Sequence, residues 1–145
     1  MEWFDKTFDE LSAREIFAIL KLRCEVFNGE QECITPDPDD QDLACRHIFC
    51  TDDGNLVAYA RYFTEDGNIT FGRVVIAKDH RGTGISQTLM ENIMAGIKNY
   101  FPGNKILIHA QYYVRGYYAK YGFTEVGEPF MEAERKHIAM EHPAL

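Results

Sequence analysis

Three features are scarce or missing in this chain of 145 residues. No stretch reaches the ~18 apolar residues that a membrane-spanning helix requires. The start, Met1–Lys6, shows no basic segment followed by an apolar run, so no signal peptide is indicated. Bases are outnumbered, with 15 lysines and arginines against 23 acids and a net charge of -8. That charge argues against nucleic acid or an anionic membrane as a partner, and together these absences favour a cytoplasmic protein.

Cysteines are also few, and their spacing is uninformative. Cys24 and Cys33 stand alone, and Cys45 and Cys50 form no Cys-x-x-Cys pair. His47 lies between the latter two, but four ligands with a recognisable zinc spacing are missing. We therefore expect no metal site and four buried, reduced thiols.

The length and the hydrophobic fraction of 46% predict one globular domain over residues 1–145, without repeats or linkers. Glu2–Phe8 reads as a strand. Ser12 and Glu15 form a capping box, which starts a helix that ends near Asn28-Gly29. Its predicted apolar face consists of Ile16, Ile19, Leu20, Cys24 and Phe27, widened by Phe17 and Val26.

An acidic loop, Thr35–Asp42, follows this helix and holds two prolines and four aspartates. Two interpretations stay open. The loop is a solvated acidic segment, or it is a rim that attracts a cationic substrate.

The rest of the chain predicts a mixed α/β sheet with helices on its faces. Two Asp-Gly turns join three strands into an antiparallel meander. A helix, a strand, a short helix stopped by Gly122, and two closing strands follow. The predicted ranges are His47–Thr51, Leu56–Phe63, Ile69–Ala77, Ile85–Asn99, Lys105–Ala110, Tyr117–Tyr121, Phe123–Val126 and His137–Met140.

A glycine-rich loop between the third meander strand and the long helix suggests chemistry. Gly82 and Gly84 allow a tight turn and close approach to a ligand, and the helix start behind them offers free N–H groups. Together these features predict a phosphate or pyrophosphate seat, although a plain turn has the same pattern. The spacing is neither a Walker A motif nor a dinucleotide fingerprint.

Two ordered motifs resemble the GNAT N-acetyltransferase superfamily. Arg81-x-x-Gly84-x-Ser86 is similar to its pyrophosphate motif, with Ser86 where glycine or alanine is usual, and Tyr118-x-x-x-Gly122-Phe123 is similar to its second motif. The resemblance extends to the ElaA-like branch, which usually has a glycine-bearing segment where this chain has Ala133–Lys136. It rests on Trp3, Leu22-Arg23-x-x-Val26-Phe27-x-x-Glu30-Gln31, His47, Ala60-Arg61, Gly72-Arg73-Val74-Val75, Ala110-Gln111 and His137-Ile138-x-Met140.

The resemblance implies a GNAT-like fold, in which the antiparallel meander is followed by a parallel βαβ-type splay with flanking helices. It also implies acetyl-CoA as donor, CoA as product, and a primary amine of a small metabolite or amino-acid-like compound as acceptor. The amine would attack the thioester directly in a ternary complex. The pantetheine arm would lie along Val74, Val75 and Ile76, and the pyrophosphate on Arg81, Gly82, Thr83, Gly84, Ile85, Ser86 and Gln87.

Within that resemblance, we expect a backbone N–H near Val75 to stabilise the carbonyl oxygen and Tyr118 to protonate the leaving thiolate. His137 is the predicted base, since histidine titrates near neutrality and a histidine serves this way in related glyphosate-acetylating enzymes. Glu30 and water stay open as alternative bases. His109 and His47 are expected to be structural.

Arginines in apolar stretches are candidate anchors for a substrate carboxylate. We expect Arg23, Arg73 and Gln111 to bind it, with Arg61 a weaker candidate. Pairing of these arginines with Glu30 or Glu32 inside the protein is the alternative.

Other functions stay open. These are a protein or peptide N-acetyltransferase, a non-catalytic CoA-binding module, and an α/β interaction domain without a ligand. A homodimer is also open.

Overall fold

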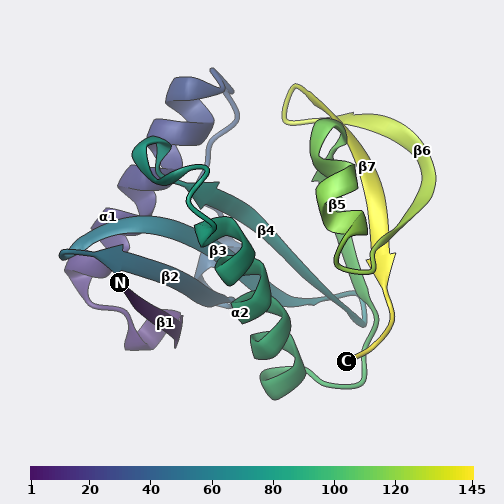
Figure 1. Cartoon of the computed structure of the whole chain (residues 1–145), viewed down its shortest axis with the longest axis horizontal. Coiled ribbons are helices and arrows are strands. Elements are labelled where there is room, and N and C mark those ends of the chain that lie inside the picture. The colour runs from purple at the N-terminus through teal and green to yellow at the C-terminus, as the bar shows by residue number, and fades with distance from the viewer.

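A seven-stranded mixed sheet, ordered β1-β2-β3-β4-β5-β7-β6, organises the computed structural model, which describes residues 1–145 (Figure 1). Neighbouring strands are antiparallel except for β4 and β5, which are parallel. The predicted meander and mixed sheet are therefore confirmed. The strands are β1 (Glu2–Thr7), β2 (Arg46–Asp52), β3 (Asn55–Glu65), β4 (Asn68–Ile76), β5 (Ile106–Gln111), β6 (Thr124–Glu132) and β7 (Arg135–His142).

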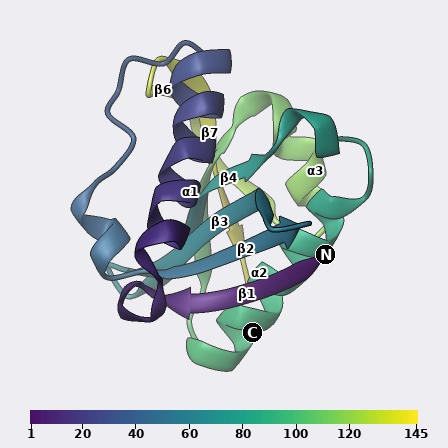
Figure 2. The ribbon, with the colours of Figure 1, turned by 90° about the vertical axis from the view of Figure 1, so that its left-hand side faces the viewer.

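Helices cover both faces of the meander, as Figure 2 shows for α1 and α2. They are α1 (Ala13–Arg23), α2 (Ile85–Tyr100) and α3 (Arg115–Ala119). Side chains alternate along each strand, so Phe49 and Tyr59 pack under α1 while Ile48 and Ala60 pack under α2. No helix is long and apolar enough to cross a membrane.

Glycine turns set the register of the meander. Asp53 and Gly54 have φ of 54° and 82°, and Asp66 and Gly67 have φ of 51° and 80°. Two successive left-handed residues match the twist of the flanking strands, which is why Asp-Gly pairs predicted these hairpins correctly.

The predicted capping box of α1 is confirmed, but its buried face differs from the prediction. Ser12 and Glu15 exchange backbone-to-side-chain hydrogen bonds of 2.8 and 3.1 Å. Wider helical turns over Cys24–Glu30 continue α1 close to the predicted end. The buried stripe includes Arg23, because its charge is paired inside, whereas Cys24 is exposed and Phe17 is 69% exposed. Of the four cysteines expected to be buried, only Cys45 and Cys50 are, and Cys33 is partly buried.

The closing strands are longer than predicted. β6 and β7 form a hairpin whose tip residues Ala133 and Glu134 have φ of 48° and 64° without any glycine. Pro129 lies in β6 at an irregular stretch of pairing between Val126 and Phe130. A proline and a turn without glycine both argue against a strand hairpin, which explains why the predicted strand ended at Val126 although β6 continues to Glu132.

Strands β4 and β5 separate after one register pair, Ile69 with Ile106 (Figure 1). The pairing of β3 with β4 also shifts between Tyr59 and Arg61, and Arg73 on β4 has a φ of 51°. A bulge of this kind bends a strand away from its neighbour. The predicted splay is thus confirmed, and it leaves the Arg73–Ile76 side of β4 without a partner strand toward β5.

Candidate active site

A cleft of about 740 Å³ lies where β4 and β5 diverge. Both strands contribute walls, and α3 contributes Tyr117 and Tyr118. The remaining walls come from the segment after α1 (residues 27–37) and from the β6–β7 hairpin. Among its polar lining residues are Gln31, Asp37, Arg61, Arg73, Ser86, His109, Gln111, Glu132, Arg135 and His137.

The glycine loop leads to the start of α2. Gly82 and Gly84 have φ of 76° and 85°, and a Cβ built on either would meet nothing within 4 Å. Gly84 caps α2 without a side-chain hydrogen bond. The first N–H groups of α2, at Ile85 to Gln87, therefore have no side-chain cap, and Ser86 lines the cleft. Such a helix start is suited to an anion.

Side-chain contacts hold the segment before this loop. His80 lies between Asp52 and Asp79, with N···O distances of 2.9 and 2.8 Å. Hydrogen bonds to these two carboxylates raise the pKa of His80 above its ordinary value. Thr83 Oγ1 donates to the His80 carbonyl at 2.6 Å. These contacts tie the loop to the end of β2.

Arg81 and Glu30, which the sequence reading placed in separate roles, are paired with each other. The guanidinium of Arg81 meets the two Glu30 oxygens at 2.9 and 3.2 Å, and its Nε donates to the Ile76 carbonyl at 3.1 Å. Both oxygens of Glu30 thus accept from Arg81. Glu30 does not line the cleft, which makes it a poor candidate for the base.

Tyr118 lines the cleft and belongs to the main hydrophobic core. It is 9% exposed and packs near Phe71 and Phe123, with ring centroids 5.9 and 6.1 Å away. Burial, reinforced by Tyr117, raises the pKa of Tyr118 to about 12. The phenol therefore keeps its proton across the neutral range.

His137 presents one ring nitrogen to the cleft. It is 7% exposed, and its Nδ1 lies 2.8 Å from the Arg135 carbonyl oxygen. Since a carbonyl can only accept, Nδ1 carries the hydrogen and donates it. In the neutral ring, the lone pair is then on Nε2. That nitrogen lies 3.9 Å from Oε2 of Glu132.

Glu132 and His109 line the cleft, although the sequence did not single out the first and the second was expected to be structural. The Nδ1 of His109 lies 2.9 Å from Oε1 of Glu132. Glu132 was not considered, because the predicted β6 ended before it. A longer hairpin could have been predicted from residues that alternate along the two strands. Phe130 and Glu132 share one face of β6, and Arg135 and His137 share one face of β7.

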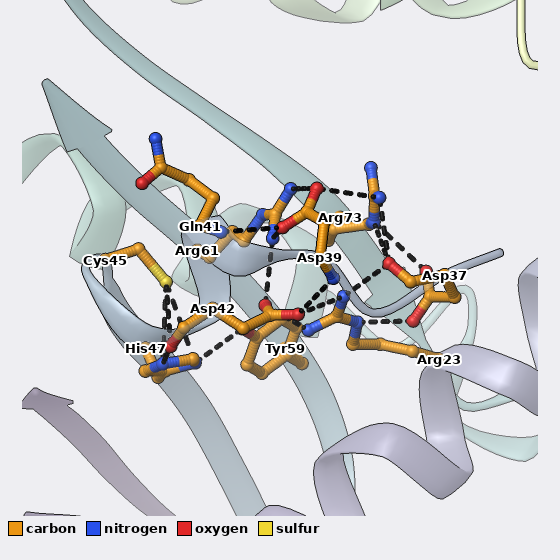
Figure 3. Close-up of polar contacts among 10 residues, drawn as sticks. All are labelled: Arg23, Asp37, Asp39, Gln41, Asp42, Cys45, His47, Tyr59, Arg61 and Arg73. Carbon is orange, nitrogen blue, oxygen red and sulfur yellow. Dashed lines mark hydrogen bonds and ion pairs between the residues drawn. The ribbon is translucent and has the colours of Figure 1, made fainter. Parts of the chain in front are cut away.

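The acidic loop forms an ionic cluster with three arginines (Figure 3). Arg23 is 0% exposed and lies 2.7 Å from carboxylates of both Asp37 and Asp42. Arg61 contacts Asp39 at 2.6 Å and Asp42 at 2.9 Å. The loop is therefore neither simply solvated nor a free cation-attracting rim. The arginines pair internally, but with these aspartates rather than with the expected Glu30 or Glu32.

Pairing with the arginines lowers the pKa values of Asp39 and Asp42. The hydrogen bonds from Arg61 hold the pKa of Asp39 down at about 2. Burial acts to raise the pKa of Asp42, but its hydrogen bond from Arg23 and its other contacts leave that pKa lowered. Asp39 and Asp42 are thus ionised at neutral pH.

The residues expected to bind a substrate carboxylate separate into two groups. Arg23 is sealed beneath the loop, and its partners occupy its donors, which corrects the expectation that it faces the substrate. Arg73 lines the cleft with 30% of its side chain exposed, although it contacts Asp37 at 3.0 Å. Gln111 lines the cleft and donates to Gln31 at 3.4 Å. Arg61 also lines it, and its Nε has no partner.

His47 has the structural role that was expected. It is buried beside the cluster, with Nδ1 2.6 Å from the Tyr59 hydroxyl and Nε2 2.9 Å from the Asp42 carbonyl (Figure 3). Burial raises the pKa of neighbouring Cys45 to about 12, so this thiol is not an activated nucleophile. No group of three or more His, Cys, Asp or Glu side chains could hold a metal ion.

Residues 30–143 match the family model described as an acetyltransferase (GNAT) domain. The chain belongs to the GNAT acetyltransferase family. It is 34% identical to the protein ElaA of Escherichia coli K12 over 150 aligned positions, covering 100% of this chain and 98% of ElaA. The predicted resemblance to the GNAT superfamily and its ElaA-like branch is thereby confirmed.

Solved structures of GNAT proteins share the fold. The crystal structure of Escherichia coli ElaA superposes with a TM-score of 0.92, at 34% identity over 97% of this chain and 98% of that one. An acyl-CoA N-acyltransferase from Pseudomonas aeruginosa gives 0.93 at 33% identity, with the same coverage of 97% and 98%. An aminoglycoside 6'-N-acetyltransferase complexed with coenzyme A, 14% identical, shares the fold alone, with a TM-score of 0.70 over 97% of this chain and 96% of that one.

Proposed function

We propose that this GNAT protein transfers an acetyl group from acetyl-CoA to a primary amine of a small metabolite or amino-acid-like compound. One observation carries the proposal. An unpaired strand edge, an uncapped helix start and a protonated buried tyrosine all border the splayed end of one sheet. That combination suits a ligand with an extended amide-bearing arm, an anionic head and a leaving group that needs a proton.

The residues present fit acetyl-CoA. Peptide-like groups of the pantetheine arm could pair with the free edge of β4 at Val74, Val75 and Ile76. The N–H groups from Gly82 to Gln87 would bind the pyrophosphate, and the open space over Gly82 and Gly84 allows close approach. Arg81 would exchange Glu30 for a phosphate oxygen. When bound, acetyl-CoA supplies an activated acyl group and a thiolate leaving group.

In the proposed reaction, the amine nitrogen forms a bond to the acetyl carbon as the carbon–sulfur bond breaks. His137 accepts a proton from the amine at Nε2, the nitrogen whose lone pair is free in the neutral ring. Tyr118 donates its proton to the departing sulfur. A β4 backbone N–H near Val75 would stabilise the charge on the carbonyl oxygen. The reaction is attack in a ternary complex, without a covalent enzyme intermediate.

Arg73 and Gln111 are proposed to contact the acceptor. Both line the cleft and contact residues that follow α1, Arg73 at Asp37 and Gln111 at Gln31. Arg73 could turn from Asp37 to a substrate carboxylate, because Asp37 would keep Arg23 as a partner. Peptide acetylation is the alternative, but pairing of the acidic loop removes the argument that this loop attracts a cationic peptide.

Two measurements test the proposal. A thermal-shift titration should detect acetyl-CoA, since ligand at a hundredfold its Kd stabilises a protein by ~2.7 kcal/mol. Thiol release should then be followed with panels of amino acids, amino-acid amides and lysine peptides. Activity with the small amines supports the proposal. A preference for peptides favours the alternative, and binding without any transfer would mean a non-catalytic CoA-binding module. No thermal shift at millimolar acetyl-CoA would overturn the cofactor assignment.

A further inference from the structure

Strand register brings a carboxylate and two imidazoles to one side of the cleft. In the β5–β7 pair, Gln111 lies opposite His137, so His109, two residues away, shares the face of His137. In the β6–β7 pair, Phe130 lies opposite His137, so Glu132 shares that face as well. Three strands thus place His109, Glu132 and His137 together, and all three line the cleft.

Hydrogen bonds fix the orientation of the three side chains. His109 Nδ1 meets Oε1 of Glu132 at 2.9 Å, while the ring of His109 packs edge-on against Phe130 with centroids 5.0 Å apart. His137 Nδ1 is engaged with the backbone. This leaves Oε2 of Glu132 and Nε2 of His137 as two acceptors facing each other at 3.9 Å.

These two acceptors have no shared donor. At 3.9 Å they are beyond direct hydrogen-bond reach, and with a neutral ring neither atom has a proton to offer. A single protonated nitrogen could lie ~2.9 Å from each and donate one N–H to the carboxylate and another to the imidazole. The separation therefore suits a primary ammonium group.

Glu132 forms no ion pair with a lysine or an arginine, and its ion-pair-distance partners are His109 and His137. Arg135 lies opposite it in register but donates to the Gln31 carbonyl, and no ion pair joins it to Glu132. Lys136 lies over the Tyr112 ring, 4.0 Å from its centroid. On the other wall, Arg73 pairs with Asp37. The remaining charged groups in or beside the cleft are Glu65, Arg61 and Glu134, and Glu134 accepts from the Ile34 N–H.

We propose that Glu132 and His137 together bind the acceptor as its ammonium ion, with His109 as the positioning residue that orients Glu132. This inference rests on the proposed function and deepens it. One N–H of the bound ammonium is aimed at Nε2 of His137. Transfer of that proton gives a neutral amine and an imidazolium, whose new charge the carboxylate compensates. The imidazolium then releases this proton to solvent, so that Nε2 is free again for the proton that the nitrogen loses as it attacks the acetyl carbon. The acceptor class is thus a primary amine that is protonated in solution.

Methylammonium chloride is the probe for this site, since it can bind whether or not it is acetylated. The chain has five histidines, so the ring signals of His109 and His137 can be assigned with His→Ala variants. We expect methylammonium to shift both signals saturably, whereas tetramethylammonium, which has no N–H, leaves them unchanged. Glu132→Gln should weaken methylammonium binding about tenfold or more, as expected for a hydrogen bond to a charged group.

Glu128→Gln is the matched control, because Glu128 lies on the same strand and is exposed outside the cleft. It should bind methylammonium like wild type. Equal binding by the Glu132→Gln and Glu128→Gln variants, or no saturable shift in wild type, would overturn the inference.

Kinetics separate this inference from the proposed function. For an amine that the enzyme acetylates, we compare the KM of the Glu132→Gln variant with that of wild type. The ratio of the two KM values should be largest below the pKa of the amine and approach 1 above it, since a neutral amine gains nothing from the carboxylate charge. A merely structural residue would raise KM equally at every pH. Methylammonium binding without any acetyl transfer would contradict the proposed function and leave the ammonium site standing.

Discussion

Replacing Arg23 by methionine should cost the protein about 3 kcal/mol of unfolding free energy at pH 7. Methionine fills a similar volume but removes the ion-pair partner that lies 2.7 Å from the carboxylates of both Asp37 and Asp42. Removing one partner of a buried ion pair costs ~3–5 kcal/mol. The lower end applies here, because Asp37 keeps Arg73 at 3.0 Å and Asp42 keeps Arg61 at 2.9 Å.

This loss of unfolding free energy corresponds to a measurable fall in the melting temperature, Tm. An unfolding entropy of ~2.1 cal/mol/K per residue gives about 0.3 kcal/mol/K for a chain of 145 residues, so Tm should fall by about 10 °C. Differential scanning calorimetry or chemical denaturation can measure this. Arg14→Met is the control, since Arg14 is exposed on the same helix and makes no ion pair, and it should change stability by less than ~0.5 kcal/mol.

Acid titration gives an independent readout of the same cluster. The pKa values of Asp39 and Asp42 are lowered in the folded state, Asp39 to about 2. Their stabilisation is therefore complete above the unfolded pKa near ~4 and is lost as the pH falls toward 2. A loss below ~1 kcal/mol for Arg23→Met at pH 7 would refute the view that this cluster holds the acidic loop against the sheet.

Three further changes test other parts of the structure. Tyr118→Phe should keep acetyl-CoA binding by calorimetry but slow thiol release about a hundredfold, the low end for a general acid; a wild-type rate would exclude this role. Gly96→Ala should destabilise the protein by ~1–3 kcal/mol in urea, because a Cβ there would lie 2.9 Å from Cζ of buried Tyr62; an unchanged midpoint would contradict this. His80→Asn should lower stability more at pH 5.5 than at pH 9, since a raised histidine pKa stabilises below ~6.5 and the benefit fades as pH rises through the folded pKa. Equal losses at both pH values would disprove the ionic contact with Asp52.

The meander and the glycine loop were predictable because their signals are local. Asp53-Gly54 and Asp66-Gly67 need only their own backbone preferences to turn the chain. Ser12 and Glu15 cap α1 within one helical turn. Gly82 and Gly84 likewise predict the glycine loop, because they directly precede the start of α2.

The side of the cleft formed by the acidic loop and the β6–β7 hairpin was not predictable, because its contacts join distant segments. Arg23 is a core residue only when the loop 14 residues further on supplies Asp37. Glu132 reaches His109 across 23 positions, through a hairpin that lacks a glycine at its tip and contains Pro129. Local patterns describe either side of such a pair but not the pairing itself, so the arginine partners were misassigned and the carboxylate was missed.

The proposed reaction is acetyl transfer to a small amine in the cleft between β4 and β5. Its most direct test is release of CoA thiol from acetyl-CoA by the purified protein across a panel of small primary amines, with mass spectrometry of the products. We expect at least one N-acetylated amine, formed only with acetyl-CoA and lost in the double variant Tyr118→Phe/His137→Ala. The absence of any acetylated small amine, with acetyl-CoA shown to bind, would contradict the proposed reaction.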